Sequence, residues 1–141
     1  MKRDLRVLYL NNKDIVRYGF GSVYHISAVS GPTNLIQKIV YYLLTETESN
    51  FYSPMVGSSF SMMSNANWSP ENENIIKAGL TTAISDIETK IKLSQVLRTL
   101  EPEESLNKLE IRSIEYDPQN HAWNVTIDVI NMLNQTFTIS I

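Results

Sequence analysis

The chain has 141 residues, a hydrophobic fraction of 43% and a formal net charge of −3 at pH 7. This length predicts a single domain over residues 1–141, large enough to bury one core. The acidic balance and the lack of a Lys/Arg cluster argue against nucleic acid, because such a surface repels a phosphate backbone on average. The absence of cysteine excludes disulfides and thiolate metal sites. No apolar run approaches the roughly 18 residues of a membrane span, so a membrane is not an expected partner.

The N-terminal part of the sequence predicts two strands followed by a helix. Residues 4–10 partly alternate between apolar and polar, and residues 23–29 are rich in β-branched and aromatic side chains. Ser30-Gly31-Pro32 ends the second strand. We expect Thr33 or Asn34 to cap the helix that follows, because their side-chain oxygens accept hydrogen bonds from the first turn. Its apolar stripe at helical spacing consists of Leu35, Ile36, Ile39, Val40, Leu43 and Leu44.

The segment from Thr45 to Asn67 has no sustained periodicity and is rich in Ser and Asn. We expect an ordered loop, because its many large apolar side chains would be unfavourable in water. A loop this long in a compact domain is usually functional or held by a partner. The apolar side chains in question are Phe51, Tyr52, Met55, Val56, Phe60, Met62 and Met63.

A second, longer helix is predicted to start at Ser69-Pro70-Glu71 and to end at Pro102. Its first apolar stripe consists of Ile76, Leu80, Ala83, Ile84, Ile87 and Ile91, and a phase-shifted stripe follows with Leu93, Val96, Leu97 and Leu100. The pattern predicts either one helix with two apolar faces or a bend near Leu93. A helix of about thirty residues would be ~45 Å long, more than the width of a small domain. Part of it is therefore expected to contact a partner.

The remaining sequence predicts three strands. Leu109 and Ile111 alternate with polar residues, and Ile114 and Tyr116 are expected on the opposite face of the same strand. In the last two strands one face is apolar (Trp123, Val125, Ile127, Val129, Phe137, Ile139 and Ile141) and the other is polar. The predicted fold is α+β: a small, largely antiparallel sheet with a C-terminal three-strand meander, packed against two main helices, one of them long.

No motif in the sequence points to a cofactor, and none is predicted. His25 and His121 have no second ligand at metal-binding spacing, and Gly19-Phe20-Gly21 lacks the third glycine of a dinucleotide-binding loop. A Ser-His-Asp arrangement is left open by the spacing, although no G-x-S-x-G nucleophile elbow is present. The acidic run Glu101-Pro102-Glu103-Glu104 would suit a glycosidic acid–base pair. A solvated helix end is favoured, because nothing apolar in the sequence surrounds the run.

The order of several short motifs resembles a known family. The motifs are Gly31-Pro32, Leu35-Ile36-Gln37, Leu43-Leu44-Thr45-Glu46, Tyr52 and Gly57. Their order is similar to the opening of the phage baseplate wedge family that includes the sheath initiator of contractile tails. The long helix that runs into residues 100–106, followed by three strands, extends the resemblance over roughly residues 20–141. Members of this family were once described as lysozyme-like.

Two departures from the family pattern affect what can be carried over. Thr47-Glu48-Ser49 stands where the family often has Gly soon after its Leu-Thr pair. Glu103-Glu104-Ser105 occupies the stretch where many members carry an Arg after Glu-Pro. Arg98 and Arg112 are the candidates to replace that Arg.

The resemblance implies a structural, non-enzymatic protein of the virion, located in the tail baseplate and present in the host cytoplasm during assembly. Its helices would bundle with other baseplate wedge proteins. Its sheet would accept an extended arm of the tail sheath protein and so template the first sheath ring. Tail tube or hub proteins are further candidate partners.

The residues themselves point to the same kind of mechanism. A terminal strand has an edge of unpaired N–H and C=O groups, and no Pro or Lys blocks residues 135–141. The interface candidates are Leu93, Val96, Leu97, Leu100, Glu101, Pro102, Thr136, Thr138 and Ser140. Two alternatives are a peptidoglycan-degrading hydrolase that uses Glu101 and Glu104, and a small cytoplasmic adaptor protein.

Overall fold

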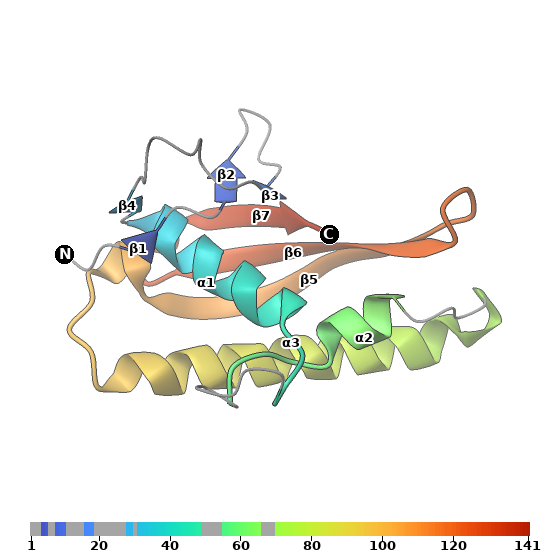
Figure 1. Ribbon diagram of the computed structural model, residues 1–141, viewed down its shortest axis with the longest axis horizontal. Coiled ribbons are helices and arrows are strands. Elements are labelled where there is room, and N and C mark those ends of the chain that lie inside the picture. Colours follow the sequence, from blue (N-terminus) through green and yellow to red (C-terminus); the bar gives the residue numbers. More distant parts are fainter. Residues whose placement is uncertain are drawn as a thin grey trace.

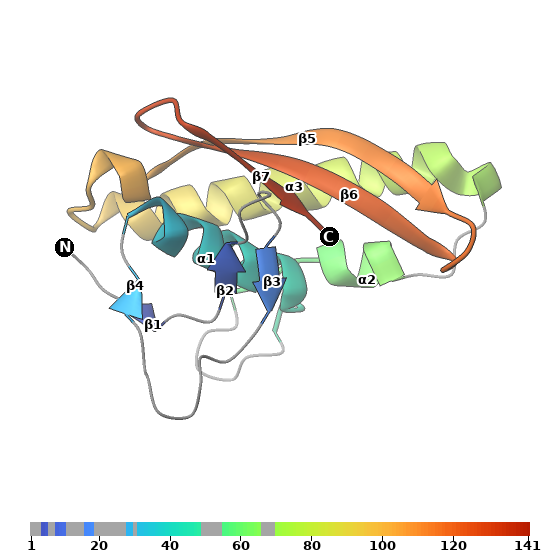
Figure 2. The ribbon, with the colours of Figure 1, turned by 90° about the horizontal axis from the view of Figure 1, so that it is seen from above.

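The computed structural model describes residues 4–5, 8–10, 16–18, 28–29, 31–48, 55–65 and 70–141. The fold is α+β, as predicted. A three-stranded antiparallel sheet at the C-terminal end of the chain packs against helices α1 (Pro32–Leu44) and α3 (Glu73–Val96) (Figure 1). Seen from above, α1 and the short helix α2 (Phe60–Asn65) lie against one face of this sheet, and no described helix or strand covers the opposite face (Figure 2).

The described N-terminal strands form two small pairs. Strand β1 (Asp4–Leu5) pairs with β4 (Ala28–Val29), and β2 (Leu8–Leu10) pairs with β3 (Val16–Tyr18), both antiparallel. The described residues of the strand predicted over 4–10 are extended, as expected, but its two ends pair with different strands. Of the strand expected over 23–29, residues 23–27 lie outside the described residues, as do His25 and the loop at Gly19-Phe20-Gly21.

Helix α1 begins one residue earlier than its expected caps. Gly31 is the N-cap residue with φ 68°, Pro32 is the first helical residue, and no side chain caps the helix from this position. The expected cap at Thr33 or Asn34 is therefore wrong, because both residues already lie in the first turn and Asn34 N–H donates to the Gly31 carbonyl. The apolar stripe is confirmed from Leu35 to Leu43, whereas Leu44 is exposed.

The described part of the segment between α1 and α3 contains a short helix, α2, where a loop was expected. Its residue Phe60 is fully buried and starts α2, and Met63 packs against the core. Met55 and Met62 are exposed in the isolated chain, and covering of these side chains by a partner stays a prediction. Phe51 and Tyr52 lie outside the described residues. The amide of Ser58 donates to the Thr45 carbonyl at 2.8 Å, which fastens the start of this segment to the residues just before α2.

Helix α3 is preceded by the 3-10 helix η1 (Pro70–Asn72) and spans 24 residues, or roughly 36 Å at the usual rise. Its first apolar stripe, from Ile76 to Ile91, is fully buried as predicted. The expected end at Pro102 is wrong, because α3 stops at Val96 and Pro102 instead begins the 3-10 helix η2 (Pro102–Glu104). The expected cap Ser69 lies outside the described residues.

The C-terminal sheet has the predicted meander order β5-β6-β7, with β5 (Leu106–Asp117), β6 (Ala122–Asn131) and β7 (Thr136–Ser140). A bulge separates Ile111 from Ser113 on β5. Beyond it, Ile114 pairs with Val125 and Tyr116 with Trp123, so both pack on the core side. The prediction that Ile114 and Tyr116 lie on the opposite face is wrong, because one extra residue in a strand reverses the alternation.

Candidate interaction site

Strand β7 is an edge strand, paired only with β6 among the described strands. Val125 and Ile141 exchange both of their backbone hydrogen bonds, at 2.8 and 3.0 Å. Such mutually bonded pairs alternate along an antiparallel ladder, so the next ones are Ile127–Ile139 and Val129–Phe137. The N–H and C=O groups of the intervening residues therefore point to the free edge. These residues are Thr136, Thr138 and Ser140, the three candidates that the sequence places on this strand.

The side chains of β7 and its neighbour carry little that would protect this edge. Thr136 and Ser140 are exposed, Thr138 is half-buried, and β7 contains no charged residue. The Thr138 hydroxyl donates to Asp128 Oδ1 at 2.8 Å, and Arg112 Nε donates to Asp128 Oδ2 at 3.0 Å. Charges or Pro on an edge strand normally discourage pairing with other chains. Strand β7 itself lacks these features.

The last turn of α3 exposes large apolar side chains. Leu93, Val96 and Leu97 are 67%, 74% and 95% exposed, respectively. Leu100 is half-buried, and Glu101 and Pro102 are exposed. Residues at i, i+3 and i+4 share one face of a helix, so the first three form an apolar ridge.

The carboxylate of Glu104 is buried, contrary to the expected solvated helix end. The residue is 1% exposed, and its Oε1 accepts a hydrogen bond from Gly31 N–H at 2.6 Å. An acidic group in this place accepts a hydrogen bond from a free N–H at the start of α1. Its negative charge also interacts favourably with the positive end of the helix dipole. The side chain of Glu104 thus replaces the local cap that the sequence was expected to provide. Glu101, its partner in the hydrolase alternative, faces solvent.

Neither arginine proposed to replace the family's Arg is shown in an ion pair with this acidic run, among the described residues. Arg112 is paired with Asp128 on the outer face of the sheet. Arg98 is exposed and its backbone N–H donates to the Gln95 carbonyl.

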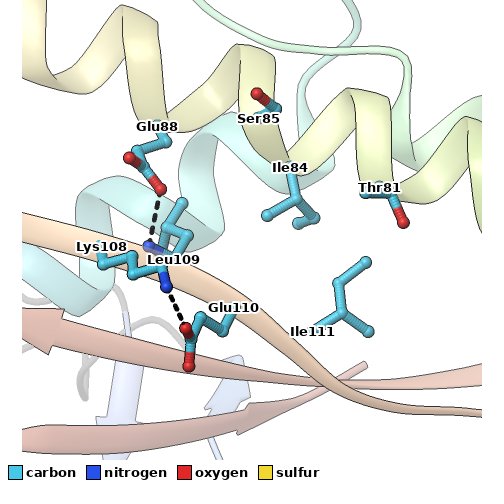
Figure 3. Close-up of a pocket in the computed structure, with 8 residues that line it drawn as sticks. All are labelled: Thr81, Ile84, Ser85, Glu88, Lys108, Leu109, Glu110 and Ile111. Carbon is cyan, nitrogen blue, oxygen red and sulfur yellow. Dashed lines mark hydrogen bonds and ion pairs between the residues drawn. The ribbon is translucent and has the colours of Figure 1, made fainter.

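A shallow groove of about 450 Å³ lies between α3 and β5 (Figure 3). Glu88 accepts a hydrogen bond from Leu109 N–H at 2.9 Å and a second one from Lys92, and Lys108 pairs with Glu110. Partial burial opposes ionisation of Glu88, but the hydrogen bonds from Lys92 and Leu109 outweigh it and lower the pKa of this carboxyl. Sequence reasoning missed this groove, because it depends on how α3 lies against β5. The Glu88 carboxylate covers a backbone donor on the outer edge of β5.

The described residues contain neither a metal-ligating cluster nor a helix able to cross a membrane. No three metal-ligating side chains gather there, and His121 instead lies in the β5–β6 turn, 3.3 Å from the Tyr116 hydroxyl. No helix in the described part of the chain has both the length and the apolar character needed to cross a membrane. Comparison with known proteins found no matching family model, curated protein or solved structure. A proposal for the function therefore depends on the geometry of β7 and of the α3 end.

Proposed function

We propose that this chain is a structural, non-enzymatic protein of a contractile phage tail baseplate, located in the virion. In this role it bundles with other wedge proteins and templates the first sheath ring by accepting a strand on β7. The observation that carries the proposal is the free backbone edge at Thr136, Thr138 and Ser140. The resemblance of the ordered motifs to the wedge and sheath-initiator family points to a phage tail baseplate as the place where this mechanism operates.

The phase of the β6–β7 ladder supports strand addition. Thr136, Thr138 and Ser140 each offer one N–H and one C=O to an incoming extended segment. Each hydrogen bond formed contributes roughly 0.5–1.5 kcal/mol net. Side chains of the added strand would alternate between the two sheet faces, which fixes its register. An arm of the sheath protein could thus continue the sheet of this chain.

The apolar ridge at the end of α3 supports the second part of the role, bundling with partner helices. Burying an exposed Leu or Val side chain stabilises a complex by roughly 1.5–3 kcal/mol. Leu93, Val96 and Leu97 together therefore offer several kcal/mol in a small area. Neighbouring helices would pack this ridge into a groove between their own side chains.

Substitution of Thr138 tests the strand-addition mechanism. Pro at this position removes an N–H that points away from β6, so the hydrogen bonds between β6 and β7 remain. We expect Thr138→Pro to leave the purified protein folded and to prevent sheath attachment to baseplates. Thr138→Val is the matched control, because it removes the hydroxyl bonded to Asp128 but keeps the edge N–H. If sheath polymerises normally on baseplates that carry folded Thr138→Pro protein, the mechanism is wrong.

Mass spectrometry of purified phage particles tests whether the protein is part of the virion. A baseplate protein should be present at a fixed copy number per particle, whereas a cytoplasmic adaptor should be missing. The hydrolase alternative requires peptidoglycan turnover by the pure protein that Glu101→Gln abolishes. Turnover with that dependence would overturn the proposal.

A further inference from the structure

Exposed apolar side chains are concentrated at one end of the molecule. The backbone N–H of Met132, in the β6–β7 turn, donates to the carbonyls of Pro102 at 3.2 Å and Ser105 at 3.0 Å. Gln95, in the last turn of α3, is bonded to both Glu104 and Leu106. The α3 end, η2 and the β6–β7 turn therefore form one connected end of the molecule, as both ribbon views show. We call it the end surface, with the apolar members Leu93, Val96, Leu97, Met132 and Leu133.

This end surface holds five of the ten strongly exposed large apolar side chains of the described residues. Its β6–β7 turn is fixed in place rather than loosely held. Asn131 is fully buried, its Oδ1 accepts from Leu133 N–H at 3.1 Å and from Gln135 N–H at 2.9 Å, and its Nδ2 donates to the Glu103 carbonyl. Met132 and Leu133 are therefore presented on a preformed turn, which lowers the entropy that binding would lose.

The end surface carries a surplus of negative charge. Glu101 is exposed and Glu103 half-buried, whereas Arg98 is the one cationic residue in the described segment from residue 93 to 106; Lys92, the residue before this segment, is paired with Glu88. The last turn of α3 contains no basic side chain, so the negative end of its dipole, about half an elementary charge, is not offset within that turn.

We infer that the end surface binds an amphipathic helix of a partner chain, with an apolar stripe flanked by Lys or Arg. Leu93, Val96 and Leu97 form a ridge at i, i+3 and i+4, which matches the groove of another helix. The negative rim selects basic flanking residues. The same rim disfavours a second copy of this chain, because two acidic rims would meet, and an anionic membrane for the same reason. The inference rests on the proposed function, since it names the chemistry of the wedge partner.

Two synthetic helical peptides test this inference. Both carry the same Leu stripe, and they differ only in having Lys or Glu at the flanking positions. Fluorescence anisotropy at low salt should show about tenfold tighter binding of the Lys peptide, as expected for two exposed charge contacts, and the preference should shrink at high salt. Equal binding of the two peptides would overturn the inference.

Protein variants locate the binding site. Leu93→Ser combined with Leu97→Ser should weaken binding of the Lys peptide at least about tenfold, as expected for two lost apolar contacts. Ile75→Ser is the control, because Ile75 is 58% exposed near the opposite end of α3, and it should bind as the unchanged protein does. An equal loss in both variants would show non-specific binding and contradict the inference.

Failure of this inference can be told apart from failure of the proposed function. Folded Thr138→Pro protein should bind the Lys peptide normally, because its change lies on the β7 edge. Normal sheath attachment in that variant would refute strand addition and leave the peptide result standing. Absence of peptide binding, with sheath attachment still dependent on Thr138, would refute only the inference about the partner helix.

Discussion

Replacement of Gly57 by Ala should destabilise the protein strongly, because its backbone conformation and its surroundings both exclude a side chain. Gly57 has φ 107°, and an added Cβ would lie 2.5 Å from the Thr45 carbonyl oxygen and 2.9 Å from the Glu46 carbonyl. The strain of an L-residue in this region is about 1–2 kcal/mol. Relief of the clash would move the Thr45 carbonyl away from Ser58 N–H, which loses a further ~0.5–1.5 kcal/mol. We expect a total loss of about 1.5–3.5 kcal/mol.

Gly79→Ala is the matched control. Gly79 lies within α3, and the near neighbours of an added Cβ belong to the flexible side chain of Met63, with its terminal methyl group nearest. The gain of up to ~1 kcal/mol in helix propensity offsets displacement of this methyl group. Urea denaturation of both variants measures the two changes in the free energy of unfolding. If Gly57→Ala is as stable as the unchanged protein, or loses no more than Gly79→Ala, the reasoning is refuted.

Three further predictions concern polar groups. Glu104→Ala should lower the free energy of unfolding by about 2–3 kcal/mol, because it leaves Gly31 N–H buried without its acceptor; Glu104→Gln, which keeps an acceptor oxygen, should lose less, and thermal unfolding would compare the two. Asn131→Asp should cost about 2–4 kcal/mol in urea denaturation, because it turns the Nδ2 donor toward Glu103 into an acceptor. The lowered pKa of Glu88 means that its stabilising effect is complete above the unfolded value of about 4.3 and is lost as the pH falls through the folded pKa. Glu88→Gln should therefore reduce the loss of unfolding free energy below about pH 4.3. An unchanged dependence of this free energy on pH in the acidic range would contradict the role given to Glu88.

Local periodicity was enough to predict the buried faces of the main elements. The stripes from Leu35 to Leu43 and from Ile76 to Ile91 are buried as their spacing indicates. The meander of β5, β6 and β7 also follows from strict alternation and from two clear turns. These features depend on residues a few positions apart, so a single sequence contains the information they need.

Other features depend on contacts between distant residues. The bulge at residue 112 puts Ile114 on the core side, and no local pattern separates a bulged strand from a two-faced one. Glu104 binds Gly31 across 73 positions of the chain, so the acidic run could not be told from a solvated helix end. The direction of the Thr138 N–H was likewise not predictable, since it depends on the phase of the ladder set by Val125 and Ile141.

Asn131 connects the two proposed docking surfaces. Its backbone N–H bonds to the Gln135 carbonyl, in phase with the β6–β7 ladder that turns the Thr138 N–H outward. Its side chain holds the turn that presents Met132 and Leu133 on the end surface. A change at Asn131 should therefore weaken both sheath attachment and binding of the Lys peptide, whereas Thr138→Pro should affect only the first and Leu97→Ser only the second. Independent responses of the two activities in folded Asn131→Asp protein would show that the turn does not couple the surfaces.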